Sequence, residues 1–220
     1  MLRKPVEAAL FDMDGLLIDT EAVYIRAYQD AATEVGATIS MELCHAMVGV
    51  PRRECEEMIQ AHFGPAFDVP AFQLVFRRHA EKHMQDSVPV KPGVPELLDF
   101  LAERGLRLGV ATSAQRASVE RYLGRAGLLD RFGAIATRGD IERPKPHPDV
   151  YLEAARRLGV APARCLAFED SNIGLEAAHA AGMMAFMVPD LLTPTPESHA
   201  RAVRVLPDLH AAVTLLREHL

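Results

Sequence analysis

Two acids separated by one residue are the clearest chemical signal in the chain. The string Asp12-Met13-Asp14-Gly15 follows the short apolar run Ala8-Ala9-Leu10-Phe11. In an extended chain, residues two apart project to the same side, so both carboxylates can face one crevice while Met13 turns away. Neighbouring carboxylates repel each other unless a cation or a proton separates them. The alternative interpretation is a turn that uses Asp and Gly because both tolerate unusual backbone angles.

A second acid pair, Glu169-Asp170, follows the apolar run Cys165-Leu166-Ala167-Phe168. If both acid pairs end strands of one parallel sheet, they meet in the crevice at its carboxyl edge, where such sheets bind ligands. Four carboxylates that converge there need a divalent cation, and oxygen ligands favour a hard ion, so we expect Mg²⁺. Asp170 has an alternative role as the N-cap of the next helix, where the helix dipole stabilises an acid.

Two further polar clusters have the chemistry to hold an anion. Thr112-Ser113 follows the apolar run 106–111, and a hydroxyl beside backbone N–H groups at a helix mouth forms an anion cradle. Capping of that helix is the commoner role of such residues. Lys145 lies between two prolines, which restrict the backbone and hold the lysine at low entropic cost. The alternative for Lys145 is a solvated loop side chain, and we interpret the nearby His147 as an exposed loop residue.

These clusters need a sheet to bring them together, and the pattern of the chain predicts one. Apolar runs at 8–11, 106–111, 134–136, 165–168, 184–188 and 203–205 read as strands. Helical patterns alternate with them at 94–104, 119–126, 149–158, 174–181 and 209–219. This alternation predicts βαβ units and a mainly parallel sheet. The runs are apolar throughout rather than at every second residue, as expected when helices cover both faces.

Residues 21 to about 85 break this alternation. Apolar residues at offsets of three and four predict one helix that ends at Gly36 and another that includes Phe72 and His83. A shorter helix is predicted from Arg52 to Phe63, before Gly64. We therefore expect a helical insertion directly after the first strand and its turn.

Composition excludes several other classes of protein. The chain has 220 residues with 24 Lys plus Arg against 30 Asp plus Glu, and this net charge of −6 argues against nucleic-acid binding. The three cysteines lack the number and spacing of a disulfide framework or a zinc site, so we expect buried thiols. We find no secretory signal and no run of about 18 apolar residues that could span a bilayer. We expect a soluble, cytoplasmic monomer without membrane partners.

With these residues in this order, the chain resembles the haloacid dehalogenase-like superfamily, in its β-phosphoglucomutase-like and phosphoglycolate-phosphatase-like branch. The motifs that match are Asp12-Met13-Asp14-Gly15, Thr112, Lys145 with Pro146, and Glu169-Asp170. The resemblance covers essentially the whole chain. It implies an α/β fold with a Rossmann-like parallel sheet core and an inserted α-helical cap domain. Residues 1–18 and 88–220 would then form the catalytic core, and residues 19–87 the cap.

The resemblance also implies a reaction, the hydrolysis of a small phosphorylated metabolite through an aspartyl-phosphate. Asp12 would attack phosphorus, and Asp14 would protonate the leaving alcohol and then activate water. Thr112 and Lys145 would neutralise the phosphoryl oxygens, while Gly15 would leave room for the phosphate. A second aspartate at position 14 argues against dehalogenation, because no leaving alcohol needs a proton in that reaction.

The same resemblance implies the metal ligands and part of the substrate site. Mg²⁺ would be held by Asp12, by Asp14 through its backbone carbonyl, and by Asp170, with Glu169 close or acting through water. Ser113 would contribute to substrate binding beside the catalytic threonine.

Cap residues distinguish members of this branch. The β-phosphoglucomutases carry a histidine near the start of the cap, where this chain has Tyr24, and this favours water over a sugar as phosphoryl acceptor. In members of this branch, a cap loop that contacts the substrate lies at the position of Gly49-Val50-Pro51-Arg52. Arg52 could therefore bind a second anionic or hydroxylated group of the substrate, or it could be a solvated arginine at the start of a helix. We therefore expect a phosphatase, most simply of a sugar phosphate. The alternatives are a hexose-phosphate mutase and a non-catalytic phosphate-binding module, and the sequence does not identify the substrate.

Overall fold

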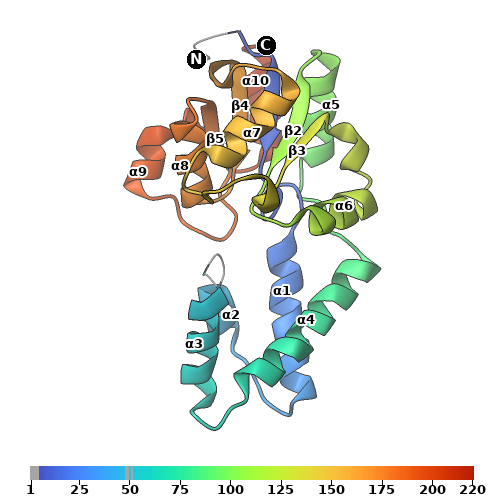
Figure 1. Cartoon of the computed structure of the whole chain (residues 1–220), viewed down its shortest axis with the longest axis vertical. Coiled ribbons are helices and arrows are strands. Elements are labelled where there is room, and N and C mark those ends of the chain that lie inside the picture. Colours follow the sequence, from blue (N-terminus) through green and yellow to red (C-terminus); the bar gives the residue numbers. More distant parts are fainter. Residues whose placement is uncertain (1–4, 48–49, 51) are drawn as a thin grey trace. The chain divides into compact units, whose positions relative to one another are not determined.

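Six parallel strands form a single sheet in this computed structural model, which describes residues 5–47, 50 and 52–220 (Figure 1). The order across the sheet is β3-β2-β1-β4-β5-β6, and every neighbouring pair is parallel. The strands are β1 (Ala8–Phe11), β2 (Arg107–Ala111), β3 (Ala134–Ala136), β4 (Cys165–Glu169), β5 (Met184–Met187) and β6 (Arg204–Val205). The predicted α/β fold with a Rossmann-like parallel sheet is confirmed.

Helices surround this sheet, as the alternating pattern predicts. They are α5 (Val94–Glu103), α6 (Arg116–Arg125), α7 (Asp149–Leu158), α8 (Asn172–Ala180), α9 (Pro196–Arg201) and α10 (Leu209–Arg217). Short 3₁₀ helices occur at η1 (Leu129–Arg131), η2 (Arg138–Asp140) and η3 (Pro162–Arg164). Every residue of β1, β4 and β5 is buried, which explains why these strands are apolar on both faces. Helix α9 is absent from our prediction because its sequence, PESHAR, has no apolar stripe.

The described part of the inserted segment consists of helices joined by short turns. It contains α1 (Thr20–Glu34), α2 (Met41–Ala46), α3 (Arg52–Phe63) and α4 (Val69–Asp86). Helix α1 packs along α4, and the stacked rings of Tyr28 and Phe76, with centroids 3.9 Å apart, form part of their contact. The sequence analysis missed α2, a six-residue helix that Ser40 caps by accepting a hydrogen bond from the Leu43 N–H.

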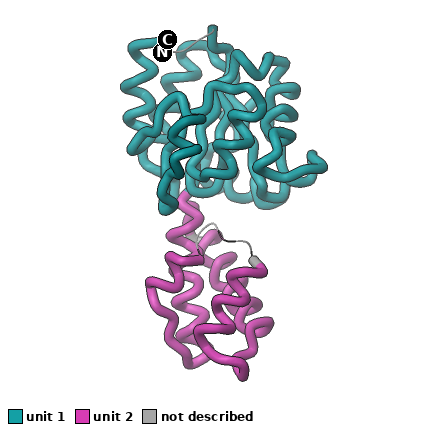
Figure 2. The backbone as a smooth tube through the Cα atoms, turned by 90° about the vertical axis from the view of Figure 1, so that its left-hand side faces the viewer, with its two compact units in different colours: residues 1–18, 89–220 teal, residues 19–88 magenta. Residues whose placement is uncertain are grey.

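The chain divides into two compact units, which Figure 2 shows in different colours. One unit joins the chain up to Ile18 with Pro89–Leu220, and the other is Asp19–Val88. The predicted cap, residues 19–87, starts at the same residue as this second unit and ends one residue earlier.

The register of the central strands determines which loops become neighbours. Phe11 at the end of β1 lies opposite Val110 of β2 on one side and Phe168 of β4 on the other. Hence the residues that follow β1, β2 and β4 emerge side by side at the carboxyl edge of the sheet. The sheet topology brings together segments that are far apart in the sequence.

Two expectations from composition are tested by the structure. Cys44, Cys55 and Cys165 are all free and buried, as predicted. Within the described ranges, no helix combines the length and apolar character needed to cross a bilayer.

One face of the sheet is stabilised by three stacked rings on adjacent strands. Phe168 stacks on Phe11 with ring centroids 5.1 Å apart and on Phe186 at 5.4 Å. We predict that Phe186→Ala lowers the free energy of unfolding by about 3–5 kcal/mol, because it leaves a cavity at a fully buried position. Denaturant unfolding measures this loss. Ile173→Ala, at a side chain that is 54% exposed, should change the value by less than about 0.5 kcal/mol, and equal losses in both variants would contradict this account of the core.

Candidate active site

Three carboxylates meet at the carboxyl edge of the sheet. Asp12 follows β1, and its backbone N–H donates to the carbonyl of Phe168 in β4 at 3.1 Å. Glu169 is the last residue of β4 and is fully buried, and Asp170 follows it. One carboxylate oxygen from each of Asp12, Glu169 and Asp170 lies within 4.8 Å of the other two. The structure thus brings together three of the four acids that the sequence analysis assigned to one site.

Lys145 provides the positive charge inside this group of acids. Its Nζ donates to Asp12 Oδ1 and to Glu169 Oε1, both at 2.5 Å, and its side chain is only 5% exposed. The lysine comes from the loop before α7, where Arg143 and Asp149 form an ion pair around the proline-flanked segment. The interpretation of Lys145 as a solvated loop residue is therefore wrong. His147, in contrast, is exposed, as expected.

Burial shifts the protonation of this cluster. It raises the pKa of Asp12 to about 7, with a further increase from the charge of Glu169, although the Lys145 ammonium acts in the opposite direction. Burial also raises the pKa of Asp170 well above its ordinary value, and the charges of Asp12 and Glu169 add to this effect. For Lys145, burial alone would lower the pKa, but the two adjacent carboxylates outweigh it and raise the pKa. The lysine therefore stays charged, and one ammonium only partly neutralises the three acids.

Tyr151 is a member of the site that the sequence analysis did not identify. Its hydroxyl donates to Glu169 Oε1 at 2.7 Å, and its ring lies 5.2 Å from Lys145 Nζ. Burial, and then the negative charge of Glu169, raise the pKa of Tyr151 well above its ordinary value, so the phenol keeps its proton. In the sequence, Tyr151 belongs to the apolar stripe of α7, and nothing in that pattern separates it from a core aromatic residue.

Glu169 has hydrogen-bond donors at both of its oxygens. Oε1 accepts from Lys145 and Tyr151, while Oε2 accepts from the Ser171 hydroxyl at 3.1 Å and from the Ser171 N–H at 3.4 Å. Four donors occupy the lone-pair directions of a carboxylate. This side chain therefore holds its neighbours in place within the site.

Ser171 also decides the role of Asp170. The Ser171 hydroxyl accepts from the Gly174 N–H at 3.1 Å, so Ser171 is the N-cap of α8. The interpretation of Asp170 as that cap is wrong. Its carboxylate, on a partly exposed residue, lies close to the other two acids.

Asp14 lies in the turn after β1, apart from the three clustered carboxylates. The turn is closed by hydrogen bonds from the Leu17 and Ile18 N–H groups to the Met13 carbonyl. Met13 is fully buried and Asp14 is partly exposed. After burial and the charge of Glu169, the negative charge of Asp14 also raises the pKa of Asp12.

The remaining predicted residues fall into two groups. Thr112 is buried at the end of β2, beside β1, and its hydroxyl accepts from the Ala114 N–H at 3.0 Å, while Ser113 is exposed. This hydrogen bond closes the turn that starts at Thr112, at the edge of the sheet where the acids meet. Arg52 begins α3, but its side chain, together with Gly49 and Pro51, lies outside the described part of the chain.

Gly15 makes the close packing of this edge possible. Its φ of +82° is in the left-handed region, and a Cβ atom there would lie 2.3 Å from Asp170 Oδ2 and 3.6 Å from Asp190 Oδ2. Asp190, which the sequence analysis did not single out, forms an ion pair with Lys91 at 2.6 Å. Its buried Oδ2 has no hydrogen-bond partner among the described residues. The space at Gly15 is occupied by the Asp170 carboxylate, and its role in leaving room for a phosphate stays a prediction.

The donor set at this edge fits a hard divalent cation. Asp12, Glu169 and Asp170 offer only oxygen atoms, which suit Mg²⁺ better than ions that prefer nitrogen or sulfur. Burial is the main cause of the raised pKa values of Asp12 and Asp170, and the charges of the neighbouring acids add to it. A bound cation would favour the ionised form of both acids.

Comparison with known proteins agrees with this geometry. The family model described as "Haloacid dehalogenase-like hydrolase" matches residues 9–188. "Phosphorylated carbohydrates phosphatase" of Thermotoga maritima is 34% identical over 179 residues, which cover 81% of this chain and 82% of that protein. "Hexitol phosphatase B" of Escherichia coli (strain K12) is 34% identical over 198 residues, which cover 84% of this chain and 85% of that protein.

A mutase and a solved structure are also similar. "Beta-phosphoglucomutase" of Bacillus subtilis (strain 168) is 30% identical over 188 residues, which cover 82% of each chain. The crystal structure of a HAD family hydrolase from Deinococcus radiodurans R1, with bound phosphate and sodium, matches with a TM-score of 0.84 at 28% identity. That match covers 97% of this chain and 96% of the other.

The close approach of Gly15 to Asp170 generates a prediction with a matched control. We predict that Gly15→Ala weakens Mg²⁺ binding by about 10–100-fold, because the new methyl group displaces the Asp170 carboxylate. Gly182→Ala introduces the same backbone strain, since Gly182 has a φ of +79°, but its Cβ would meet no atom within 4 Å. Calorimetric titration with MgCl₂ compares the two variants. Equal Mg²⁺ affinities in both would contradict the assignment of Asp170 as a metal ligand.

Proposed function

This chain belongs to the haloacid dehalogenase-like hydrolase family, and we propose that it is a Mg²⁺-dependent phosphatase of small phosphorylated metabolites, above all sugar phosphates. Family membership and relatives named as phosphatases make it a phosphatase enzyme. One observation carries the finer proposal: the buried Lys145 ammonium joins Asp12 to Glu169, with the Asp170 carboxylate beside them. Such a cluster can hold a phosphoryl group next to a carboxylate nucleophile.

In the proposed reaction, Asp12 is the nucleophile. Lys145 binds its Oδ1, which fixes the orientation of the carboxylate and leaves Oδ2 to attack phosphorus. The new bond joins Asp12 to phosphorus, and the bond from phosphorus to the substrate alcohol breaks, which divides one difficult displacement into two easier ones. Water then attacks phosphorus and releases both phosphate and the free Asp12 carboxylate.

Asp14 moves the proton in both steps. It donates a proton to the leaving alcohol oxygen, then takes one from the water that attacks the intermediate. Its position in the turn after β1 supports this role, because it lies near Asp12 but outside the three clustered carboxylates. A group that must exchange protons with substrate and water benefits from partial exposure.

Lys145 and Thr112 stabilise the charge on the transferring phosphoryl group in this proposal. Lys145 is already desolvated and positively charged, so it needs no reorganisation when negative charge develops near Asp12. Thr112 directly follows β2, the strand that pairs with β1, and its hydroxyl and the following N–H groups would bind a phosphoryl oxygen. Exposed Ser113 would contact the substrate beside it.

The metal site is proposed on Asp12, Asp170 and the backbone carbonyl of Asp14. When bound, Mg²⁺ would neutralise the carboxylates and the phosphoryl oxygens. Glu169 does not bind the metal directly in this proposal. Its two oxygens already accept four hydrogen bonds, and it orients Lys145 and Ser171 through them. Its contribution to the metal would pass through water or through these neighbours.

The substrate class rests on the relatives and on the absence of a mutase residue. Two relatives are named as phosphatases of phosphorylated carbohydrates and of hexitol phosphates. The similarity to Beta-phosphoglucomutase supports the alternative of a hexose-phosphate mutase. Tyr24, at the position where we expect the mutase histidine, favours water as acceptor. A non-catalytic phosphate-binding module is disfavoured because every expected catalytic group is present.

A phosphate-release screen tests the function directly. We predict Mg²⁺-dependent release of inorganic phosphate from sugar phosphates, with weaker release from nucleoside monophosphates and phosphoglycolate. Excess EDTA should stop the reaction, and added MgCl₂ should restore it. With labelled hexose phosphate, a phosphatase releases the label as phosphate, whereas a mutase keeps it on the sugar. Isomerised sugar phosphate without phosphate release would establish the mutase instead, and silence with all substrates would favour the binding module.

The nucleophile assignment generates a separate prediction. Asp12→Asn should reduce turnover by roughly 10³-fold or more while the protein stays folded, because Lys145 keeps its second partner, Glu169. Asp130→Asn, at an exposed aspartate away from the site, is the matched control and should keep full activity. Steady-state kinetics, with circular dichroism as a check on folding, measure the effect. Substantial turnover by folded Asp12→Asn protein would exclude Asp12 as the nucleophile.

A further inference from the structure

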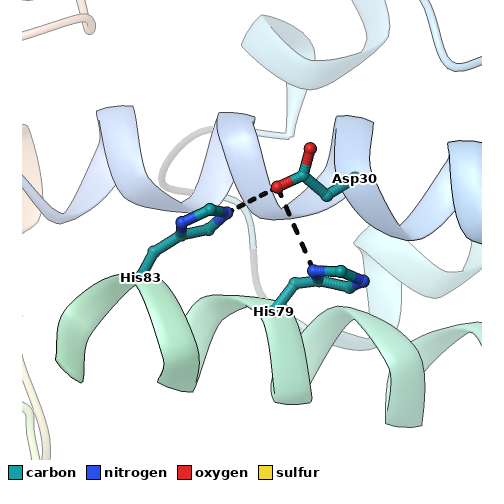
Figure 3. Close-up of side chains that lie close together, drawn as sticks. All are labelled: Asp30, His79 and His83. Atoms are coloured by element: carbon teal, nitrogen blue, oxygen red, sulfur yellow. Dashed lines mark hydrogen bonds and ion pairs between the residues drawn. The ribbon is translucent and has the colours of Figure 1, made fainter. Parts of the chain in front are cut away.

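A second group of potential metal ligands lies in the helical unit Asp19–Val88. His79 and His83 are one turn apart on α4, and Asp30 projects toward them from α1 (Figure 3). Glu34 lies one turn after Asp30 on α1 and also contacts His79. Residues four apart share a face of a helix, so the two histidines on α4 oppose the two acids on α1.

The distances in this group suit a metal ion. Asp30 Oδ2 lies 2.6 Å from His83 Nε2 and 4.0 Å from His79 Nδ1, and one potential ligand atom from each of the three residues lies within 4.8 Å of the other two. Around a tetrahedral Zn²⁺ ion with bonds of about 2.0–2.2 Å, adjacent ligand atoms are about 3.3–3.5 Å apart. The Asp30–His83 distance is shorter than this value and the Asp30–His79 distance is longer. A change of less than about 1 Å in each contact would therefore accommodate the ion.

Glu34 determines which nitrogen of His79 is available. His79 Nε2 lies 2.7 Å from Glu34 Oε2, and an ionised carboxylate only accepts hydrogen bonds, so Nε2 carries the hydrogen. In the neutral ring, the Nδ1 lone pair then faces Asp30. Metal-binding histidines commonly donate their other N–H to a carboxylate in this way, which fixes the tautomer and the ring orientation. Arg78 forms an ion pair with Glu34 and holds this carboxylate in turn.

The group is partly open to solvent. The side chains of His79 and His83 are 20% and 21% exposed, and that of Asp30 is 43% exposed, so an ion can enter and a water molecule can complete its coordination. Two imidazole nitrogens and one carboxylate oxygen suit Zn²⁺ and, by the usual order of stability, Cu²⁺ or Ni²⁺. They are a poor match for Mg²⁺, which prefers oxygen ligands alone.

We propose that Asp30, His79 and His83 form a site for a divalent transition-metal ion, with Zn²⁺ as the first choice, and that Glu34 orients His79 within it. The bound ion joins α1 to α4, the first and last helices of their unit. Binding requires the lone pair of His83 Nε2, so the hydrogen that lies between Nε2 and Asp30 must move to the other ring nitrogen or to solvent. The site uses none of the residues proposed for phosphate transfer, and its chemistry differs from theirs.

The test uses full-length protein without a histidine tag, stripped of metal and kept in excess MgCl₂ so that Mg²⁺ occupies the carboxylate site. Titration with ZnCl₂ in a calorimeter should give one bound ion per chain and a higher melting temperature. Titration with CoCl₂ should give the visible absorption of a Co²⁺ ion with nitrogen and oxygen ligands. The double variant H79Q/H83Q should lose saturable binding, the melting shift and the absorption.

Matched controls separate this site from general histidine binding. The variant H45Q/H62Q removes the same number of histidines from exposed positions of the same unit and should bind Zn²⁺ like the parent protein. Glu34→Gln should weaken binding by about 10–100-fold if it orients His79. Because the histidines are partly exposed, we expect H79Q/H83Q to fold and to keep Mg²⁺-dependent phosphatase activity, which separates this test from that of the proposed function.

Three results would overturn the proposal. One is an unchanged Zn²⁺ affinity in H79Q/H83Q, and another is an equal loss of affinity in H45Q/H62Q. The third is parent protein with no saturable Zn²⁺ binding and no Co²⁺ absorption, which would leave the group as hydrogen bonds and ion pairs between α1 and α4.

Discussion

The buried ammonium of Lys145, shared between Asp12 and Glu169, is the interaction on which the site depends. A buried carboxylate without a partner would be strongly destabilising, and two such groups on neighbouring strands would repel each other. The lysine makes their proximity tolerable and remains charged because they surround it. One ammonium against three ionised carboxylates still leaves a deficit of positive charge at this edge of the sheet. That deficit is the physical reason to expect a cation.

The fold fixes this arrangement through backbone geometry and small residues. The pairing of β1 with β4 places Asp12 next to Glu169, and the Asp12 N–H bond to Phe168 locks the register at the point where the site begins. Gly174 leaves room for the Glu169 side chain, since a Cβ atom there would lie 2.1 Å from its carboxylate oxygens. Tyr151 and Ser171 supply the other hydrogen bonds to Glu169. Substitution of Gly174, Tyr151 or Ser171 would therefore act on Lys145 and Asp12 through Glu169.

The sequence was sufficient to predict those features that depend on local pattern. Continuous apolar runs such as Ala8–Phe11 can only be buried strands between helices, and acids directly after two of them, at Asp12 and Glu169, had to emerge at the same sheet edge. Short elements escaped prediction, because α2 and α9 have six residues each and carry too little periodicity. Tyr151 and Asp190 also escaped, since their roles depend on contacts with residues that are distant in sequence. The cap role given to Asp170 failed because Ser171, one residue later, has the hydroxyl that reaches the Gly174 N–H.

Chemical trapping of the intermediate tests the central claim that Asp12 receives the phosphoryl group. Enzyme in steady state with a sugar phosphate and Mg²⁺ is quenched with sodium borohydride, which reduces an aspartyl-phosphate to homoserine. Peptide mapping by mass spectrometry then locates the modified residue. The account predicts homoserine at position 12, dependent on both substrate and Mg²⁺. Homoserine at another aspartate, or its absence while phosphate is being released, would contradict it.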